Sequence, residues 1–363
     1  MNKQIQIIHL NNKIMKKYKL RLIAIFTVVG LALTSCNKDE DAPANDNTIV
    51  GLASNNANLS LLVKALTKTS LVTTLKGTGP FTVFAPTNTA FENANYTASV
   101  IDNLDAAGIA KLKEILLNHV ISGAVTSTQL ATTPSLYVNT FASGPGATKL
   151  SMYIATTTTP TVSVVINGGK STASGDGKKG ATVTTANVTA SNGVVHIVDG
   201  VIGLPTIVDL VVTNPEFDTL QTVVTSTTGS FGNQSAVLAD LSNLTPAAPG
   251  TLFAPNNAAF TSLLSELSTA GIVPTPLQYS SVLRYHAVSG NLRAAALPGI
   301  ISGPSAGVVP TLNTQNITLS LTGGAKITGA FTPTRPASNI ILTDIQGSNG
   351  VIHVLDKVLL PTL

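Results

Sequence analysis

The stretch SNGVVHIVDG, residues 191–200, and the stretch SNGVIHVLDK, residues 348–357, are nearly the same ten residues written twice. Each copy places one histidine, His196 or His353, in the middle of a run of β-branched apolar residues. Such a run, preceded by an Asn-Gly turn, predicts a buried strand. Because the motif recurs about one small domain later, it also indicates that a larger unit of this 363-residue chain has been duplicated.

Three further segment pairs occur in the same order and support the duplication. TIVGLA matches TIVDLV, FTVFAPTNTAF matches GTLFAPNNAAF, and NHVISG matches YHAVSG. The separation of the partners varies little along the chain, so the loops differ in length while the core elements persist. The repeated unit has a usual domain size. We therefore predict two tandem domains, the first repeat (residues 47–205) and the second repeat (residues 206–363).

Within each repeat, helical patterns precede strand patterns. Apolar residues recur at helical spacing through residues 58–75, with a break near Thr69, and again through residues 106–120. The residues expected on one face of the second pattern are Ile109, Leu112, Leu116 and His119 or Val120. The last part of each repeat reads as strands separated by glycine turns. Helices first and strands last predict an α+β domain.

The matched segments resemble a known family. FTVFAPTNTAF and SNGVVHIVDG, with their second copies, are similar to the two signature segments of the fasciclin-like FAS1 domain, and YHAVSG resembles its tyrosine–histidine motif. The resemblance covers almost all of residues 47–363 and implies two tandem α+β domains, each a β-sandwich or wedge with helices on one side. The first repeat departs from the pattern at Asn118, where a tyrosine is usual. The family's association with cell adhesion implies a non-covalent binding function without catalysis.

The histidines decide whether the chain reads as an enzyme. The candidate residues of the two repeats are His119, His196, His286, His353, Asp199 and Asp356. A His–Asp dyad or a metal site is the functional interpretation. However, residues three apart on a strand point to opposite faces, and a metal needs three or more ligands. We interpret the histidines as buried imidazoles that hydrogen-bond to the backbone and join a helix to a strand. The sequence predicts no catalytic residue, metal or cofactor.

Residues 1–35 are predicted to be a lipoprotein signal peptide. They hold six of the 21 basic residues and no acidic residue, and Met15 is a possible true start. The apolar stretch 22–33 is short for a membrane span and has the length of a secretory signal. The end of this segment, LTSC, resembles the bacterial lipobox, so Cys36, the only cysteine, is the predicted lipidation site. A plain signal peptide or an uncleaved anchor helix is the alternative.

Residues 36–46 are polar and acidic, which predicts a flexible tether. Their KDED cluster resembles the export signal of bacterial surface lipoproteins. The sequence therefore predicts an outer-membrane lipoprotein of the cell envelope that faces outward. A periplasm-facing scaffold or assembly protein is the alternative.

The charge balance restricts the partners. Without residues 1–35, 15 basic residues remain against 17 acidic ones, a net charge of −2, so nothing favours binding to nucleic acid. The expected partners are the membrane, through the lipid, and an extracellular matrix, a polysaccharide or a surface protein.

Overall fold

The computed structural model describes residues 46–158, 161–169, 179–330 and 336–362. Asn45–Leu363 form a compact unit that contains both repeats. The predicted signal peptide, Cys36 and all of the predicted tether except its last residue lie outside the described residues. Within those residues, no helix combines the length and apolar character that crossing a bilayer requires.

The described strands of the first repeat form a closed barrel in the order β1-β2-β3-β4-β5-β6-β7. The barrel closes through a parallel pairing of β1 with β7, and the other neighbours are antiparallel. The strands are β1 (Phe81–Pro86), β2 (Val120–Ser122), β3 (Ser135–Ser143), β4 (Lys149–Thr157), β5 (Ser163–Ile166), β6 (Ala181–Ala190) and β7 (Gly193–Val198). The α-helices are α2 (Ile49–Ser54), α3 (Ser60–Lys68), α4 (Val72–Leu75), α5 (Asn88–Asn93), α6 (Ala98–Asp102), α7 (Ala106–Leu117) and α8 (Ser127–Leu130).

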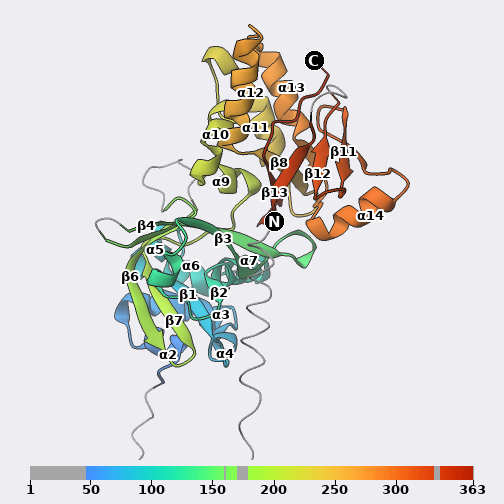
Figure 1. The fold of residues 1–363 in the computed structure, drawn as a ribbon. Coiled ribbons are helices and arrows are strands. Elements are labelled where there is room, and N and C mark those ends of the chain that lie inside the picture. Colours follow the sequence, from blue (N-terminus) through green and yellow to red (C-terminus); the bar gives the residue numbers. More distant parts are fainter. Residues whose placement is uncertain (1–45, 159–160, 170–178, 331–335, 363) are drawn as a thin grey trace, which may run out of the picture. The chain divides into compact units, whose positions relative to one another are not determined.

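The second repeat has a seven-stranded sheet among its described residues, in the order β10-β11-β12-β13-β14-β8-β9. Figure 1 shows its helices α10 to α13 gathered on one side of β8. The strands are β8 (Gly250–Pro255), β9 (Ala287–Ser289), β10 (Val308–Pro310), β11 (Asn316–Ser320), β12 (Lys326–Thr328), β13 (Ser338–Gly347) and β14 (Gly350–Leu355). The α-helices are α9 (Ile207–Val212), α10 (Asp218–Val224), α11 (Ser235–Ser242), α12 (Asn257–Thr269), α13 (Pro276–Tyr285) and α14 (Leu297–Ser302).

Both repeats therefore have the predicted α+β composition. The segment FTVFAP, which the sequence also predicts to be a short buried strand, forms β1 between the helices of the first repeat, and GTLFAP forms β8 at the equivalent place. Each pairs with the last strand of its repeat. The helical pattern of residues 58–75 breaks where expected, since Ser70 has a positive φ of 58° between α3 and α4. The second pattern is shorter than its periodicity suggested. Helix α7 ends at Leu117, and His119 and Val120 lie beyond its C-cap, Asn118.

The repeated motif forms β7 and β14, and its Asn-Gly turn is a structural joint. Asn192 accepts a hydrogen bond from the Ile49 backbone at the start of α2 and donates to the carbonyls of Leu75 and Gly77. The next residue, Gly193, packs so closely on β1 that a Cβ atom would lie 2.0 Å from the carbonyl oxygen of Phe81. The motif thus fixes the first helix, α4 and the first strand around one turn.

The second copy of the turn repeats this joint. Asn349 accepts from the Ile207 backbone at the start of α9 and donates to the carbonyl of Leu241. A Cβ atom on Gly350 would lie 2.2 Å from the carbonyl oxygen of Gly250. The shared geometry explains why the same Asn-Gly pair appears in both repeats.

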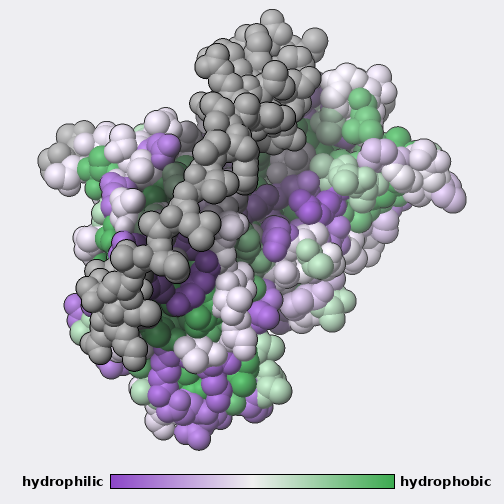
Figure 2. All heavy atoms as spheres, turned by 90° about the horizontal axis from the view of Figure 1, so that it is seen from below, coloured by the Kyte–Doolittle hydropathy of each residue, from purple (hydrophilic) through white to green (hydrophobic). Residues whose placement is uncertain are grey.

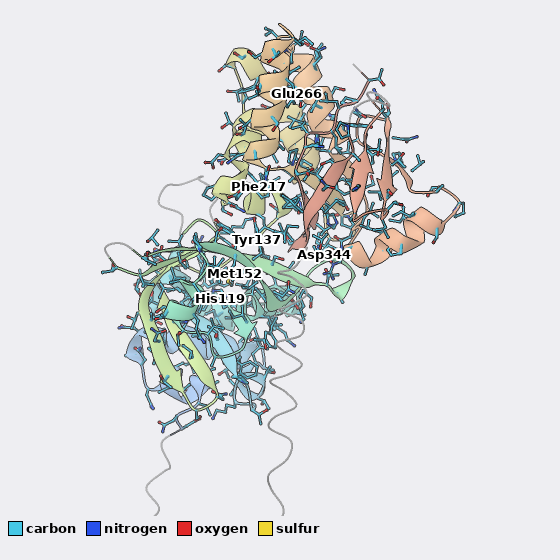
Figure 3. All side chains as sticks on the ribbon, viewed as in Figure 1. His119, Tyr137, Met152, Phe217, Glu266 and Asp344 are labelled. Atoms are coloured by element: carbon cyan, nitrogen blue, oxygen red, sulfur yellow. The ribbon has the colours of Figure 1, made fainter. Side chains whose placement is uncertain are left out.

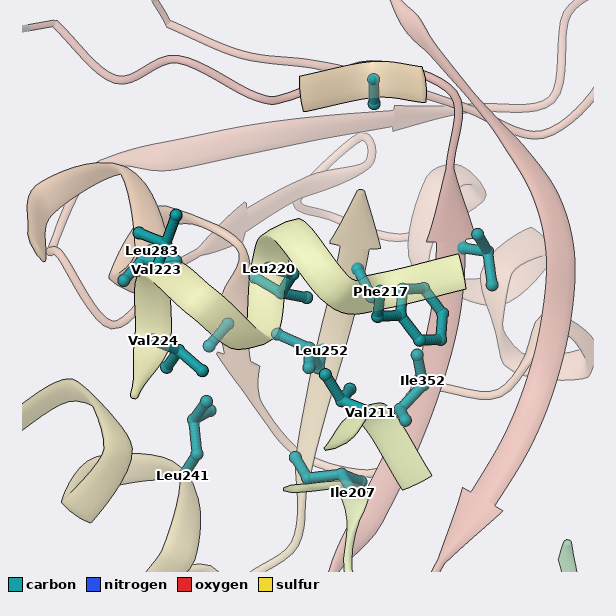
Figure 4. Packing of buried hydrophobic residues seen from close by; sticks show 14 of the residues in the cluster. Ile207, Val211, Phe217, Leu220, Val223, Val224, Leu241, Leu252, Leu283 and Ile352 are labelled. Atoms are coloured by element: carbon teal, nitrogen blue, oxygen red, sulfur yellow. The ribbon is translucent and has the colours of Figure 1, made fainter. Parts of the chain in front are cut away.

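The helices of the second repeat pack apolar side chains against those of its strands in one buried core, part of which Figure 4 shows. Ile207 and Val211 come from α9, Phe217 precedes α10, and Leu252 and Ile352 come from the parallel strands β8 and β14. Each of these side chains contributes about 1.5–3 kcal/mol to the stability of the fold when it is fully buried and not exposed to water.

Strands β3 and β4 of the first repeat contact the second repeat. Tyr153 belongs to the second repeat's core cluster and lies 5.1 Å from the ring of Tyr137. The Tyr137 hydroxyl donates to the Leu210 carbonyl at 3.2 Å and accepts from the Asn214 amide at 2.9 Å. The backbone N–H of Gln346 also donates a hydrogen bond to the Ser151 hydroxyl at 2.9 Å. The two repeats therefore share apolar and polar contacts at this junction.

Candidate functional site

The first histidine of each repeat follows a helix and joins that helix to a distant backbone segment. His119 donates from Nδ1 to the Ile115 carbonyl at 2.7 Å, and its Nε2 accepts from the Ile202 backbone at 2.9 Å. His286 makes the equivalent bonds to the Val282 carbonyl at 2.7 Å and from Leu359 at 2.9 Å. Figure 3 shows His119 within the interior of the first repeat. Both nitrogens of each ring are therefore used inside the fold.

The second histidine of each repeat lies in the repeated motif and has the opposite tautomer. His196 accepts at Nδ1 from the Asn187 backbone at 3.2 Å and donates from Nε2 to the Val125 carbonyl at 2.9 Å. His353 does the same with Asp344 at 3.4 Å and the Leu292 carbonyl at 2.7 Å. These rings join a strand to a neighbouring strand and a loop, so the predicted helix-to-strand connection is wrong for His196 and His353.

The backbone donors to these two rings are themselves special positions. Asn187 and Asp344 have positive φ values of 62° and 63° and lie at irregularities in the β6–β7 and β13–β14 pairings. Asn and Asp adopt this conformation more readily than most residues. Each also accepts, through its side chain, the N–H of the first residue of a short helix: Ser127 of α8 and Ala294 of a 3-10 helix, Ala294–Ala296. The histidine thus holds a strained bulge against its own strand.

The two aspartates of the motif bond elsewhere than to the histidines' ring nitrogens. Asp199 accepts from the Thr182 backbone at 2.7 Å, and Asp356 accepts from the Asn339 backbone at 2.7 Å. Since both nitrogens of His196 and His353 are bonded to backbone groups, they are not available for a His–Asp dyad. Among the described residues, no group of three or more His, Cys, Asp or Glu side chains could hold a metal ion.

Burial keeps the four imidazoles neutral. All four are at most 2% exposed. Burial lowers the pKa of His119 and of His286 to about 4, against a smaller raising effect of the carbonyls of Ile115 and Val282. It also lowers the pKa of His196 and of His353. Protonation would place an N–H opposite the backbone donor that each ring now accepts from, so the hydrogen-bond pattern itself favours the neutral form.

The position before the first histidine differs between the repeats. Tyr285 is fully buried and donates from its hydroxyl to the Asn316 carbonyl at 2.6 Å, while accepting from the Ala330 backbone at 2.7 Å. Asn118 is also buried, but its shorter side chain bonds to Gly203 and Thr140. Asn118, which stands where a tyrosine is usual, therefore has different hydrogen-bond partners from Tyr285. The polar side chains of both residues have partners inside the fold.

The sequence did not predict the apolar pocket between α10, α12 and α13. Its volume is about 340 Å³, at the low end for ligand pockets. The lining residues are Thr219, Val223, Phe231, Phe260, Leu263, Leu264, Glu266, Leu267, Ala270, Ile272, Pro274, Gln278, Tyr279, Val282 and Leu360. The lining residues Leu264 and Ile272 are 41% and 52% exposed, so the mouth of the pocket is also apolar. Next to lining residues in the sequence, Val273 and Leu277 are 86% and 82% exposed. One feature of the sequence could have indicated this pocket: the loop before Thr275 contains an apolar run, whereas loops are usually polar.

Figure 2 shows another face of the molecule, on which hydrophobic and hydrophilic residues are interspersed. Ion pairs of the described residues lie at partly exposed positions. Examples are Lys64–Asp102 and Arg284–Asp240, both at 2.7 Å. Exposed pairs of this kind contribute about 0–1 kcal/mol each. The described surface therefore offers mainly amide, hydroxyl and apolar groups for contact.

Comparison with known proteins gives consistent results. Residues 57–205 and 223–361 match the Fasciclin domain. Protein sll1483 of Synechocystis is 35% identical over 156 residues, which are 43% of this chain and 72% of that protein. Another Synechocystis protein, sll1735, is 34% identical over 154 residues, which are 42% of this chain and 96% of that protein.

Among solved structures, the chain resembles a FAS1 domain pair from the insect cell adhesion molecule Fasciclin I. The TM-score is 0.52 at 19% identity, covering 84% of this chain and 98% of the other. This likeness concerns the fold, and it extends over both repeats.

Proposed function

This chain belongs to the Fasciclin domain family, and from that premise we propose that it is a non-catalytic adhesion module, held by a lipid on Cys36 at the outer surface of a cell envelope. Domains of the family occur in cell adhesion proteins such as insect Fasciclin I. Its ligand would be an extracellular matrix, a polysaccharide or a surface protein.

The observation that carries this proposal is the use of the four histidines. Each ring nitrogen of His119, His196, His286 and His353 bonds to a backbone group inside the fold. The residues that the sequence offers for acid–base chemistry therefore serve the architecture. Function is then left to the surface, which supports binding over catalysis.

The mode of binding follows from charge and duplication. Charged residues make up 10% of the chain, so contacts would depend on hydroxyl, amide and apolar groups more than on ion pairs. We expect attachment to persist at moderate salt, where a phosphate-type electrostatic binder weakens steeply. Two linked domains raise the effective concentration of the second contact once the first has formed.

The anchor is tested by substitution. Cys36→Ala removes the acyl acceptor, so we expect it to abolish labelling with a radioactive fatty acid and to release the protein from membranes. Ser35→Ala is the matched control, because it keeps a small residue before the cysteine and should remain lipidated. Unchanged detergent partitioning of Cys36→Ala would contradict the lipid anchor.

Adhesion is tested on cells. Cells that carry the anchored protein should attach to a matrix or form a biofilm better than cells that carry only the anchor and tether, residues 1–46. Protease added to intact cells should digest the exposed body. Equal attachment together with full protection from protease would instead favour a periplasm-facing scaffold.

A further inference from the structure

The first repeat shows what fills the position of the pocket in this fold. There, helix α6 folds back against α3, and Ile101 is fully buried in a cluster with Leu61, Phe91 and Leu112. The Asp102 side chain binds Lys64 at 2.7 Å, and the Asp102 carbonyl accepts from Lys68 at 2.7 Å. Helix α6 is thus a plug, anchored by one isoleucine and two lysines.

The pocket of the second repeat has matching walls. The Asn257 side chain accepts from the Thr219 backbone at 3.0 Å, just as Asn88 accepts from Leu61 at 2.9 Å, so Thr219 is the counterpart of Leu61. The matched segments NTAF and NAAF make Phe260 the counterpart of Phe91. Counting back from the first histidine of each repeat makes Tyr279 the counterpart of Leu112. Thr219, Phe260 and Tyr279 all line the pocket.

In the described part of the second repeat, no separate helix corresponds to α6. Helix α12 continues from Asn257 to Thr269, where the first repeat breaks between α5 and α6. Counted from the NTAF and NAAF segments, the exposed Ala270 stands where the first repeat has Ile101. Thr222 and Ser226 stand where Lys64 and Lys68 bind Asp102. Among the described residues, the second repeat therefore has matching walls but no separate helix like α6 and no lysines at the positions of Lys64 and Lys68.

We propose that this pocket binds a short amphipathic helix of a partner protein, whose branched aliphatic side chain enters it as Ile101 enters the core of the first repeat. The inference rests on the proposed function, because it names the chemistry of a partner. A helix also accounts for the apolar mouth. Leu264, Ile272, Val273 and Leu277 are 41–86% exposed, and the flanking residues of a helix would cover them.

Glu266 is the one charged side chain among the described residues that line the pocket, and Figure 3 shows it on α12. The other lining side chains are apolar or uncharged, which suits a branched aliphatic side chain of a partner helix.

The probe is a synthetic peptide of residues 94–105, ANYTASVIDNLD, with a side-chain staple, because isolated helices this short are marginal. The protein is the compact body, residues 45–363. We expect saturable chemical-shift changes centred on Phe260, Ala270 and Tyr279. The same peptide with Ile101→Asp should bind at least about tenfold more weakly, because it loses a buried isoleucine.

Protein variants locate the site. Ala270→Ile should fill the pocket and weaken binding of the peptide at least about tenfold, as should Leu277→Asp at the mouth. Leu342→Asp is the matched control, because Leu342 is 45% exposed on β13, outside the pocket lining, and should bind as the unaltered protein does.

Three results would overturn the proposal: no binding, equal binding of the Ile101→Asp peptide, or binding that Ala270→Ile leaves unchanged. Binding of the dye anilinonaphthalene sulfonate in the pocket without binding of the peptide would also overturn it, in favour of a small apolar ligand. The peptide assay uses isolated residues 45–363, whereas the attachment experiment uses whole cells. Failure of the peptide to bind would therefore not change the result of the attachment experiment, which tests adhesion by itself.

Discussion

Mild acid should destabilise this protein through His119 and His286. Both rings are neutral in the fold, with one nitrogen donating and the other accepting a backbone hydrogen bond. Their pKa is lowered by burial to about 4, from an unfolded value of 6.5. The unfolded chain therefore binds more protons than the folded one between these two values. The stabilisation is complete above pH 6.5 and is lost as the pH falls toward 4.

The size of the effect follows from the two pKa values. A shift of this size corresponds to about 3 kcal/mol per histidine once the pH is below both values. At pH 5, most of the protonation difference is already present, so each ring costs about 2 kcal/mol relative to neutral pH. The window between pH 7 and 5 avoids most carboxylate titration, because Asp and Glu have ordinary pKa values near 4.

Urea unfolding of residues 45–363 at pH 7, 6 and 5, followed by circular dichroism, measures this loss. The informative variant is His286→Gln, which keeps a donor and an acceptor but cannot titrate. We expect it to lose about 2 kcal/mol less between pH 7 and 5 than the unaltered protein. The double variant with His119→Gln should be flatter still. NMR titration of the histidine Cε1–H signals checks the pKa values directly.

Two outcomes would refute this reasoning. One is an unaltered protein that is equally stable at pH 7 and pH 5. The other is a His286→Gln variant whose stability falls with pH as steeply as that of the unaltered protein, which would mean that another group carries the pH dependence.

Four further substitutions test the architecture by urea unfolding. His353→Ala leaves a buried backbone donor and a buried carbonyl unpaired, so it should cost about 1–3 kcal/mol; a loss below 0.5 kcal/mol, the ordinary range for surface changes, would contradict the structural role. Gly193→Ala places a Cβ atom 2.0 Å from the Phe81 carbonyl oxygen and should destabilise the first repeat, whereas wild-type stability would show that the two strands can separate freely. Tyr153→Ala removes an aromatic residue from the junction of the repeats, so it should cost about 3–5 kcal/mol of stability and uncouple the unfolding of the two repeats. Tyr137→Phe removes only a hydroxyl and should cost about 1 kcal/mol. Equal losses in the two variants would contradict the packing of Tyr153 at the junction.

The sequence predicted that the histidines bond to the backbone but did not identify which backbone groups they bond to. Their recurrence in matched apolar runs indicated buried, structural rings. The groups that receive their bonds, such as the carbonyls of Val125 and Leu292, are backbone atoms, which leave no side-chain signature. The tautomer of each ring likewise depends on which distant segment supplies the N–H. Only the folded chain brings those segments together.

The sequence by itself determined the tandem repeat, the α+β composition and the family, because periodicity, turn residues and repeated motifs are local and survive in the linear order. The tertiary structure decided the rest. The parallel pairing of FTVFAP with GVVHIV joins segments more than a hundred residues apart, and no local preference specifies it. The pocket lies among α10, α12 and α13 of the second repeat, where α12 continues to Thr269 and the first repeat instead buries Ile101 of a separate helix, α6. An absence of packing is visible only where the surrounding helices are in place.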